Sequence, residues 1–146
     1  MGQQQLILII LVSIIIGVAT IVALNILNNR ADKSNREAVR QDLAAAASLV
    51  QSIWERPSLM GGANKRFLSI GESKILEYLN IPSSDYQPGD DVVTNVNGTY
   101  SVEIISDTEL HIIGEPVSGH PKIQISVSRN SDTSIWEFEI TEIEEN

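Results

Sequence analysis

The hydrophobic pattern of the chain takes three successive forms, and the first is an uncharged apolar run over residues 6–27. As a helix, these 22 residues would span about 33 Å, which is enough to cross the hydrocarbon core of a bilayer. Backbone groups in lipid have to be paired within the segment. We therefore expect a helix here, although Ile and Val are frequent.

The flanks of this run distinguish a retained helix from a cleaved secretory signal. Residues 1–5 contain no Lys or Arg, and the run ends in Asn25-Ile26-Leu27-Asn28-Asn29 rather than in a small-residue cleavage site. A secretory signal would have a basic start and such a site. The sequence therefore predicts a helix that remains part of the protein.

Small residues recur at helical spacing within the run, at Ser13, Gly17 and Thr20. Such residues on one helix face allow another helix to approach closely. The alternative is that they are ordinary small residues of a helix that faces lipid. On the first interpretation, the residues of the helix–helix contact are Leu6, Ile10, Ser13, Gly17, Thr20 and Leu24.

The second form is an apolar stripe with spacings of four and three residues, which predicts an amphipathic helix over residues 34–56. Pro57 ends this helix, because the residue before a proline disfavours the α region. We expect the stripe to pack on the chain's own sheet. The predicted packing residues are Val39, Leu43, Val50, Ile53 and Trp54.

The connection between the two helical segments has two interpretations. One is a single helix from about Gln3 to Glu55. The other is a break near residues 28–34 followed by a new helix, since Ser34 and Glu37 have the spacing of a capping box. Asn, Asp and Ser are concentrated here and weaken a helix, so we expect local strain or melting.

The third form is period-two alternation over residues 92–143, which predicts strands with one buried and one wet face. Asn97-Gly98 predicts a two-residue hairpin turn. Residues 57–91 contain turns and one short helix that ends near Asn80. The expected fold class is α+β, with a long N-terminal helix packed on an antiparallel meander of four or five strands. The expected domains are residues 1–29, the apolar helix, and residues 30–146, the head.

Charge and composition narrow the function. The net charge is −9, yet residues 30–71 carry seven Lys/Arg against four Asp/Glu, whereas residues 72–146 carry three against fifteen. Such an acidic head would repel nucleic acids and anionic lipids, so we exclude nucleic-acid binding by the head. The chain has no cysteine, which excludes disulfides, zinc–thiolate sites and thiol catalysis.

Few residues suggest chemistry. His111 in a strand and His120 in a turn are interpreted as surface or structural residues, and we expect neither an enzyme nor a cofactor. Asn97 begins an N-glycosylation sequon, Asn-Gly-Thr, at a turn. Asp85, Asp90 and Asp91 surround a Pro-Gly turn, where they are either turn-forming residues or a candidate calcium site.

Two motifs resemble those of type IV pilin-like proteins. Gly2-Gln3-Gln4-Gln5 before the apolar run resembles a prepilin-type processing site, in which a membrane peptidase cuts after the glycine, here between Gly2 and Gln3. Trp54-Glu55-Arg56-Pro57 with Gly61-Gly62 resembles the helix exit of bacterial pilins. The family usually has a glutamate at the fifth mature position. If cleavage follows Gly2, that position is Ile7, and if Met1 is the mature start, it is Gln5. Neither is charged, so docking would rest on apolar packing and glutamine hydrogen bonds.

This resemblance implies a filament subunit. It implies residence in the inner or cytoplasmic membrane, processing by a prepilin peptidase, extraction by a pilus assembly machinery and polymerisation with identical subunits into an extracellular pilus. Two alternatives remain open. One is a pseudopilin of a type II secretion or DNA-uptake system, and the other is a single-pass anchored binding module.

Overall fold

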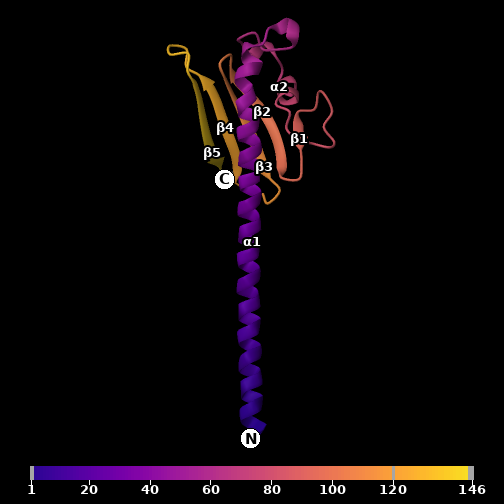
Figure 1. Ribbon diagram of the computed structural model, residues 1–146, viewed down its shortest axis with the longest axis vertical. Coiled ribbons are helices and arrows are strands. Elements are labelled where there is room, and N and C mark those ends of the chain that lie inside the picture. The colour runs from indigo at the N-terminus through magenta and orange to yellow at the C-terminus, as the bar shows by residue number, and fades with distance from the viewer. Residues whose placement is uncertain (1, 120, 145–146) are drawn as a thin grey trace. The chain divides into compact units, whose positions relative to one another are not determined.

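The computed structural model describes residues 2–119 and 121–144 of the chain (Figure 1). It confirms the α+β class: a 54-residue N-terminal helix packs against a five-stranded antiparallel sheet. The elements are α1 (Gly2–Glu55), η1 (Ser58–Met60), η2 (Phe67–Ser69), α2 (Glu72–Tyr78), β1 (Val92–Thr94), β2 (Gly98–Ser106), β3 (Glu109–Pro116), β4 (Lys122–Arg129) and β5 (Trp136–Ile143).

Helix α1 has no break, so the expected melting near residues 28–34 is wrong. Those polar residues weaken a helix by small amounts that flanking turns can offset. Ser34 therefore does not cap a helix terminus. The chain nevertheless divides into two compact units, one up to Ser34 and one from Asn35. We call residues 2–34 the apolar unit and residues 35–119 with 121–144 the head.

The sheet of the head is a meander in the order β1-β2-β3-β4-β5, with every neighbouring pair antiparallel (Figure 1). The second half of α1 lies on one face of it and buries the predicted stripe. Side chains that alternate along β2, β3 and β4 supply the other side of this core. The largest fully buried side chains include Tyr100, Phe67, Leu43, Ile53, Leu110, Ile112 and Ile123.

The β1–β2 connection differs from the expected two-residue turn. Thr94 pairs with Thr99, so four residues lie between them, and neither Asn97 nor Gly98 has the positive φ that the expected turn requires. Asn95 organises the loop, because its side-chain oxygen accepts from the backbone N–H groups of Asn97 and Gly98. A Cβ at Gly98 would lie 2.2 Å from the Glu115 carbonyl oxygen, so close approach of strands explains this glycine.

Strand β5 departs from the predicted burial. Phe138 and Ile140 alternate as expected, but their side chains are 50% and 48% exposed. The helix surface opposite them consists of the small side chains of Ala44, Ala47 and Ser48, and these leave the strand partly uncovered. The alternation therefore placed the apolar side chains on one face correctly, but half of each remains accessible in the isolated chain.

The segment after α1, residues 57–66, folds back over the end of the helix, and we call it the tip loop. Backbone N–H groups of Ala63, Lys65 and Asn64 donate to the carbonyls of Ile53, Trp54 and Arg56 at 3.0, 2.7 and 2.9 Å. These bonds satisfy carbonyls that a helix end leaves unpaired. The loop is thereby held in a single backbone arrangement at the end of the head where α1 ends (Figure 1).

Gly114 on β3 provides a test of the helix–sheet packing. A Cβ there would lie 2.6 Å from Val39 Cγ1 and 3.3 Å from Leu43 Cδ1. We expect Gly114→Ala to lower the free energy of unfolding of the head by about 2 kcal/mol through overpacking. Denaturant unfolding of the full chain in detergent, followed by tryptophan fluorescence, measures this. Gly71→Ala is the control, because the nearest atom to its added Cβ is 4.0 Å away; equal losses would contradict the interpretation.

Candidate functional site

The surface of the apolar unit is the first candidate site. All large aliphatic side chains of residues 6–27 are exposed, from 43% for Val12 to 64% for Ile7 and Ile9. Exposed apolar surface of this extent marks a contact with protein or membrane. By length and composition, α1 qualifies as a membrane span, a test that an N-terminal signal sequence also passes.

The two hydroxyl groups within this surface are paired inside the helix. Ser13 Oγ donates to the Ile9 carbonyl and Thr20 Oγ1 to the Ile16 carbonyl, both at 2.8 Å. Neither hydroxyl needs a partner from water or from another molecule. Gly17 lies between them on the same face, and a Cβ there would meet nothing within 4 Å. The structure thus keeps this face slim and without an unpaired side-chain donor.

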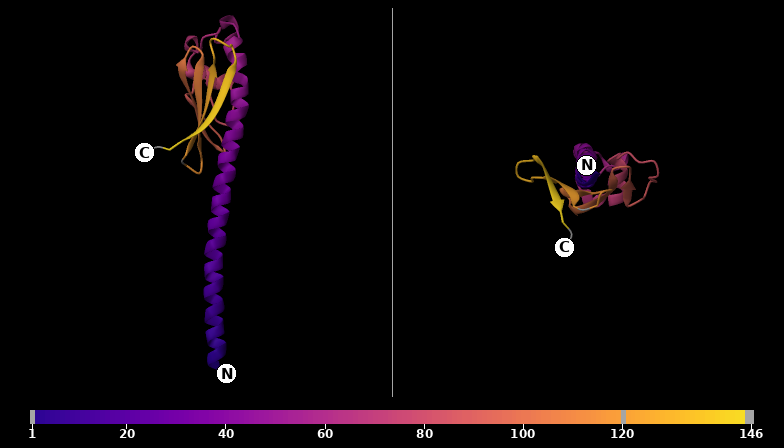
Figure 2. Two further views of the ribbon diagram at one scale, coloured as in Figure 1. Left: turned by 90° about the vertical axis from the view of Figure 1, so that its left-hand side faces the viewer. Right: turned by 90° about the horizontal axis from the view of Figure 1, so that it is seen from below.

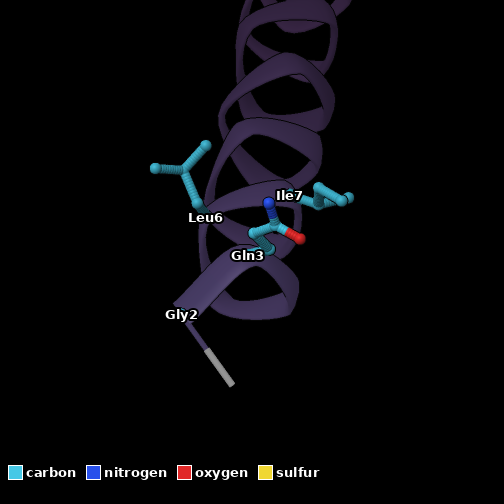
Figure 3. A pocket seen from close by; sticks show the side chains of 4 residues that line it. All are labelled: Gly2, Gln3, Leu6 and Ile7. Atoms are coloured by element: carbon cyan, nitrogen blue, oxygen red, sulfur yellow. The ribbon is translucent and has the colours of Figure 1, made fainter.

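The predicted processing site lies on the first turns of α1 (Figure 3). Gly2, Gln3, Leu6 and Ile7 line an open hollow between side chains of successive turns. In Figure 3 the side chains of Gln3, Leu6 and Ile7 diverge from the helix, and none covers the backbone at Gly2. Gly2 and Gln3 are both exposed, and a Cβ at Gly2 would meet nothing within 4 Å outside the neighbouring helix backbone. Met1 lies outside the described residues.

The helix–sheet packing residues all lie in the core of the head. Val39, Leu43 and Val50 have no exposed surface, and Ile53 is 1% exposed. Trp54 packs edge-on against Trp136, with ring centroids 5.5 Å apart, and its Nε1 donates to the Asp107 carbonyl at 2.9 Å. The exit of α1 is thereby tied to both the β2–β3 turn and β5.

A polar cluster around Asp42 is one feature that the sequence did not reveal. Asp42 Oδ2 accepts from the Tyr100 hydroxyl at 2.5 Å, from Asn97 Nδ2 at 2.9 Å and from Asn95 Nδ2 at 3.1 Å. Partial burial raises the pKa of Asp42, but the hydrogen bonds from Asn97, Tyr100 and Asn95 outweigh it, and the pKa falls below its ordinary value. Burial, then the bond to Asp42, raises the pKa of Tyr100 well above its ordinary value.

The same cluster engages the candidate glycosylation residue. Asn97 is half-buried, and its side-chain amide donates to Asp42. The backbone carbonyl of Asn97 accepts from Asn35 Nδ2 at 2.8 Å and from the Val117 N–H at 3.0 Å. A glycan attaches to this amide nitrogen. Modification of the folded head would therefore disturb the bond to Asp42.

The remaining candidates are dispersed. Among the described residues, no group of three or more His, Asp or Glu side chains is arranged to hold a metal ion, and Asp85, Asp90 and Asp91 form no such group. Asp90 instead accepts from the Gln87 N–H at 3.0 Å within its own turn. His111 Nε2 lies 3.4 Å from Glu109 Oε1 on β3. His120 lies outside the described residues.

A second apolar surface lies on the head itself, between α1 and β5. It is a groove of about 340 Å³, which we call the flank groove, lined by Ala44, Ala47, Ser48, Ile125, Phe138 and Ile140. An ion pair between Arg40 and Glu142 joins α1 to the β5 side of the head. Figure 2 shows β5, in yellow, beside the second half of α1. Sequence periodicity did not indicate this groove, because it results from small helix residues opposite a strand 90 residues later.

Comparison with known proteins gave no match: no family model fits the chain, and neither curated proteins nor solved structures yielded a relative. The architecture alone, a long apolar N-terminal helix whose continuation packs on a five-stranded antiparallel sheet, is consistent with a pilin-like protein.

Proposed function

We propose that this chain is the structural subunit of a type IV pilus-like filament, which polymerises through its apolar unit. The observation that carries the proposal is the uncharged surface of residues 6–27, which is exposed in the isolated chain, on a helix whose second half forms the core of a head. A role as a membrane anchor alone would explain the apolar first half of α1. The slim, internally satisfied face at Ser13, Gly17 and Thr20 favours helix–helix contact.

The energetics support a durable polymer. In lipid, an apolar helix gains little hydrophobic free energy from an identical partner. In water, releasing a subunit would expose about 20 apolar side chains, at about 1.5–3 kcal/mol for each large one. The sum is tens of kcal/mol as an upper bound, because the reference state also buries surface. Such a filament would persist without covalent links, which suits a chain that has no cysteine.

The proposal includes a sequence of locations and partners. The subunit first resides in the inner or cytoplasmic membrane through residues 6–27. A prepilin-type peptidase cuts between Gly2 and Gln3, which are both exposed. An assembly machinery then transfers the processed subunit into an extracellular filament of identical copies.

The experiment is to shear surface filaments from cells that make this protein and to analyse their composition and N-terminus. We expect this chain as the main component, with Gln3 as the first residue. Recovery only as a detergent-soluble monomer from membranes would overturn the proposal and favour an anchored binding module. A deletion that stops protein export while surface fibres remain normal would favour a pseudopilin.

A further inference from the structure

We propose that the tip loop of one subunit docks into the flank groove of a second copy. The inference rests on the proposed function and adds a specific head-to-head contact to it. Each head carries both the tip loop and the flank groove, at different places. The helix wall of the groove ends at Ser48, about 10 Å along α1 from the start of the tip loop.

The tip loop has the properties of an inserted anchor. Leu59 is 99% exposed and Met60 is 70% exposed, side by side in η1. A single exposed leucine is common, but these two lie on a loop fixed by backbone bonds to the helix end and by Gly61 with φ of +76°. Gly62 leaves no room for a Cβ, which would lie 2.2 Å from the Arg56 carbonyl oxygen. A fixed loop loses little conformational entropy on binding.

The flank groove has the properties of the receiving surface. Its lining is uncharged, and Phe138 and Ile140 are the apolar side chains of the sheet that α1 leaves half uncovered. Ile125 of β4 is buried and also lines the groove. An aliphatic side chain placed there would therefore contact apolar atoms of both the helix and the strands, and it would leave no charge unpaired.

Charge selects a second copy as the occupant. Residues 56–71 carry Arg56, Lys65 and Arg66 and no acidic residue. Residues 130–144, which include the strand wall of the groove, carry five acidic residues and no Lys or Arg. Arg66 pairs with Asp107, and Glu142 pairs with Arg40, within one head. Lys65 of the loop, and Glu137 and Glu139 on the outer face of the edge strand β5, are then the opposite charges that a contact between copies would bring together. Such complementarity orients the partners and suppresses contacts between like surfaces, namely loop with loop or strand with strand.

In the proposed filament, where the subunits point the same way, each head would give its loop to one neighbour and its groove to another, so the contact is heterologous. A reciprocal pair, in which each loop fills the other copy's groove, would instead close as a dimer and yield only dimers on oxidation. Heterologous contacts do not close into a dimer; they continue as rings or open helical polymers. A filament built by the apolar units would therefore gain a second series of contacts along its shell.

Disulfide trapping tests the contact, since the native chain has no cysteine. Cells would make the full chain with Leu59→Cys and Ile140→Cys together, and their filaments would be oxidised and run on a non-reducing gel. We expect a ladder of dimers, trimers and higher multiples, because each chain contributes one cysteine to each of two contacts. Val117→Cys with Ile140→Cys is the matched control, as Val117 is 70% exposed in a different loop. Leu24→Cys with Ile140→Cys tests the apolar unit as the occupant.

The outcomes separate this inference from the proposed function. Normal filaments with no ladder from Leu59 and Ile140, or with a ladder only from Leu24 or Val117, would overturn the docking inference alone. Absence of filaments from unmodified cells would overturn the proposed function instead.

A second experiment, which exchanges the charges of Lys65 and Glu139, tests the docking if the cysteine variants do not assemble. We expect Lys65→Glu and Glu139→Lys each to lower the filament yield several-fold and the double variant to restore at least half of it. Glu103→Lys, on the exposed side of β2, should leave the yield unchanged. Failure of the double variant to restore assembly would count against the docking.

Discussion

Replacing Gly17 by leucine should lower the yield of filaments at least tenfold while leaving the head folded. Gly17 lies in open space in the isolated chain: apart from its chain neighbours and the nearby backbone of its own helix, a Cβ added there would have no atom within 4 Å. Leucine is also the better helix former by about 0.8 kcal/mol, so the substitution does not weaken α1. A defect would thus arise from contact with another helix, which the larger side chain would hold away at the slim face.

The measurement compares the amount of protein in sheared filaments with the cell-associated amount by immunoblot. Denaturant unfolding followed by tryptophan fluorescence, as described for Gly114→Ala, verifies that the head of each variant is folded. Ala19→Leu is the matched control, a small-to-large change about 200° around the helix from Gly17. If Gly17→Leu filaments form at the normal yield, the face at Ser13, Gly17 and Thr20 is not the packing face. An anchored monomer would tolerate both substitutions equally.

Removing the Asp42 carboxylate should cause a large loss of head stability, about 3 kcal/mol for Asp42→Ala at pH 7. The substitution leaves the hydroxyl of buried Tyr100 and the amides of Asn95 and Asn97 without their shared acceptor. Hydrogen bonds to a charged group contribute about 1.5–3 kcal/mol each, and bonds that share one atom do not add fully. Denaturant unfolding of the full chain in detergent measures the loss.

The pH dependence follows from the direction of the shift. The pKa of Asp42 is lowered in the folded state, so its stabilisation is complete above the unfolded value of about 3.9 and is lost as the pH falls through the folded value. The difference between wild type and Asp42→Ala should therefore shrink below about pH 4. Asp132→Asn, at an exposed turn carboxylate, is the control and should change the free energy of unfolding at pH 7 by less than about 0.5 kcal/mol. A difference for Asp42→Ala that is independent of pH would contradict this account.

At alkaline pH, the stability of the head should fall as the pH rises. The pKa of Tyr100 is raised in the folded state, so its contribution is complete below about pH 10, the unfolded value, and falls as the pH rises further. Tyr100→Phe should remove this part of the alkaline loss of stability, although it costs the bond to Asp42. Melting curves at pH 8 and pH 10.5 check the expectation, and an unchanged alkaline loss would argue against it.

Periodic patterns predicted much of the fold, because periodicity reports which side chains share a face. Ile123, Ile125 and Val127 are buried on β4 as their alternation indicates. The same pattern misjudged Phe138 and Ile140, since alternation cannot tell whether the opposite element is large enough to cover a strand. At residues 28–34, local propensity also misled, because a continuous helix outweighed several weak helix formers.

The polar cluster around Asp42 was less predictable, because its members lie far apart in the sequence. The partners of Asp42 are 53 to 58 residues away, and nothing near Asp42 in the sequence marks it as their acceptor. In the sequence, Asn97 begins a sequon and forms the predicted turn together with Gly98. Its bonds in the folded head connect it to Asn35, Asp42 and Val117 instead.

The internal bonding of Ser13 and Thr20 has a consequence for reuse of the subunit. Because both hydroxyls are already paired with their own backbone, moving this helix between a protein bundle and fatty acyl chains requires no new partner for either of them. If the proposed filament forms, a copy withdrawn from it would therefore re-enter the bilayer without breaking a hydrogen bond of Ser13 or Thr20. The membrane would then act as a reservoir from which the same molecules are drawn repeatedly.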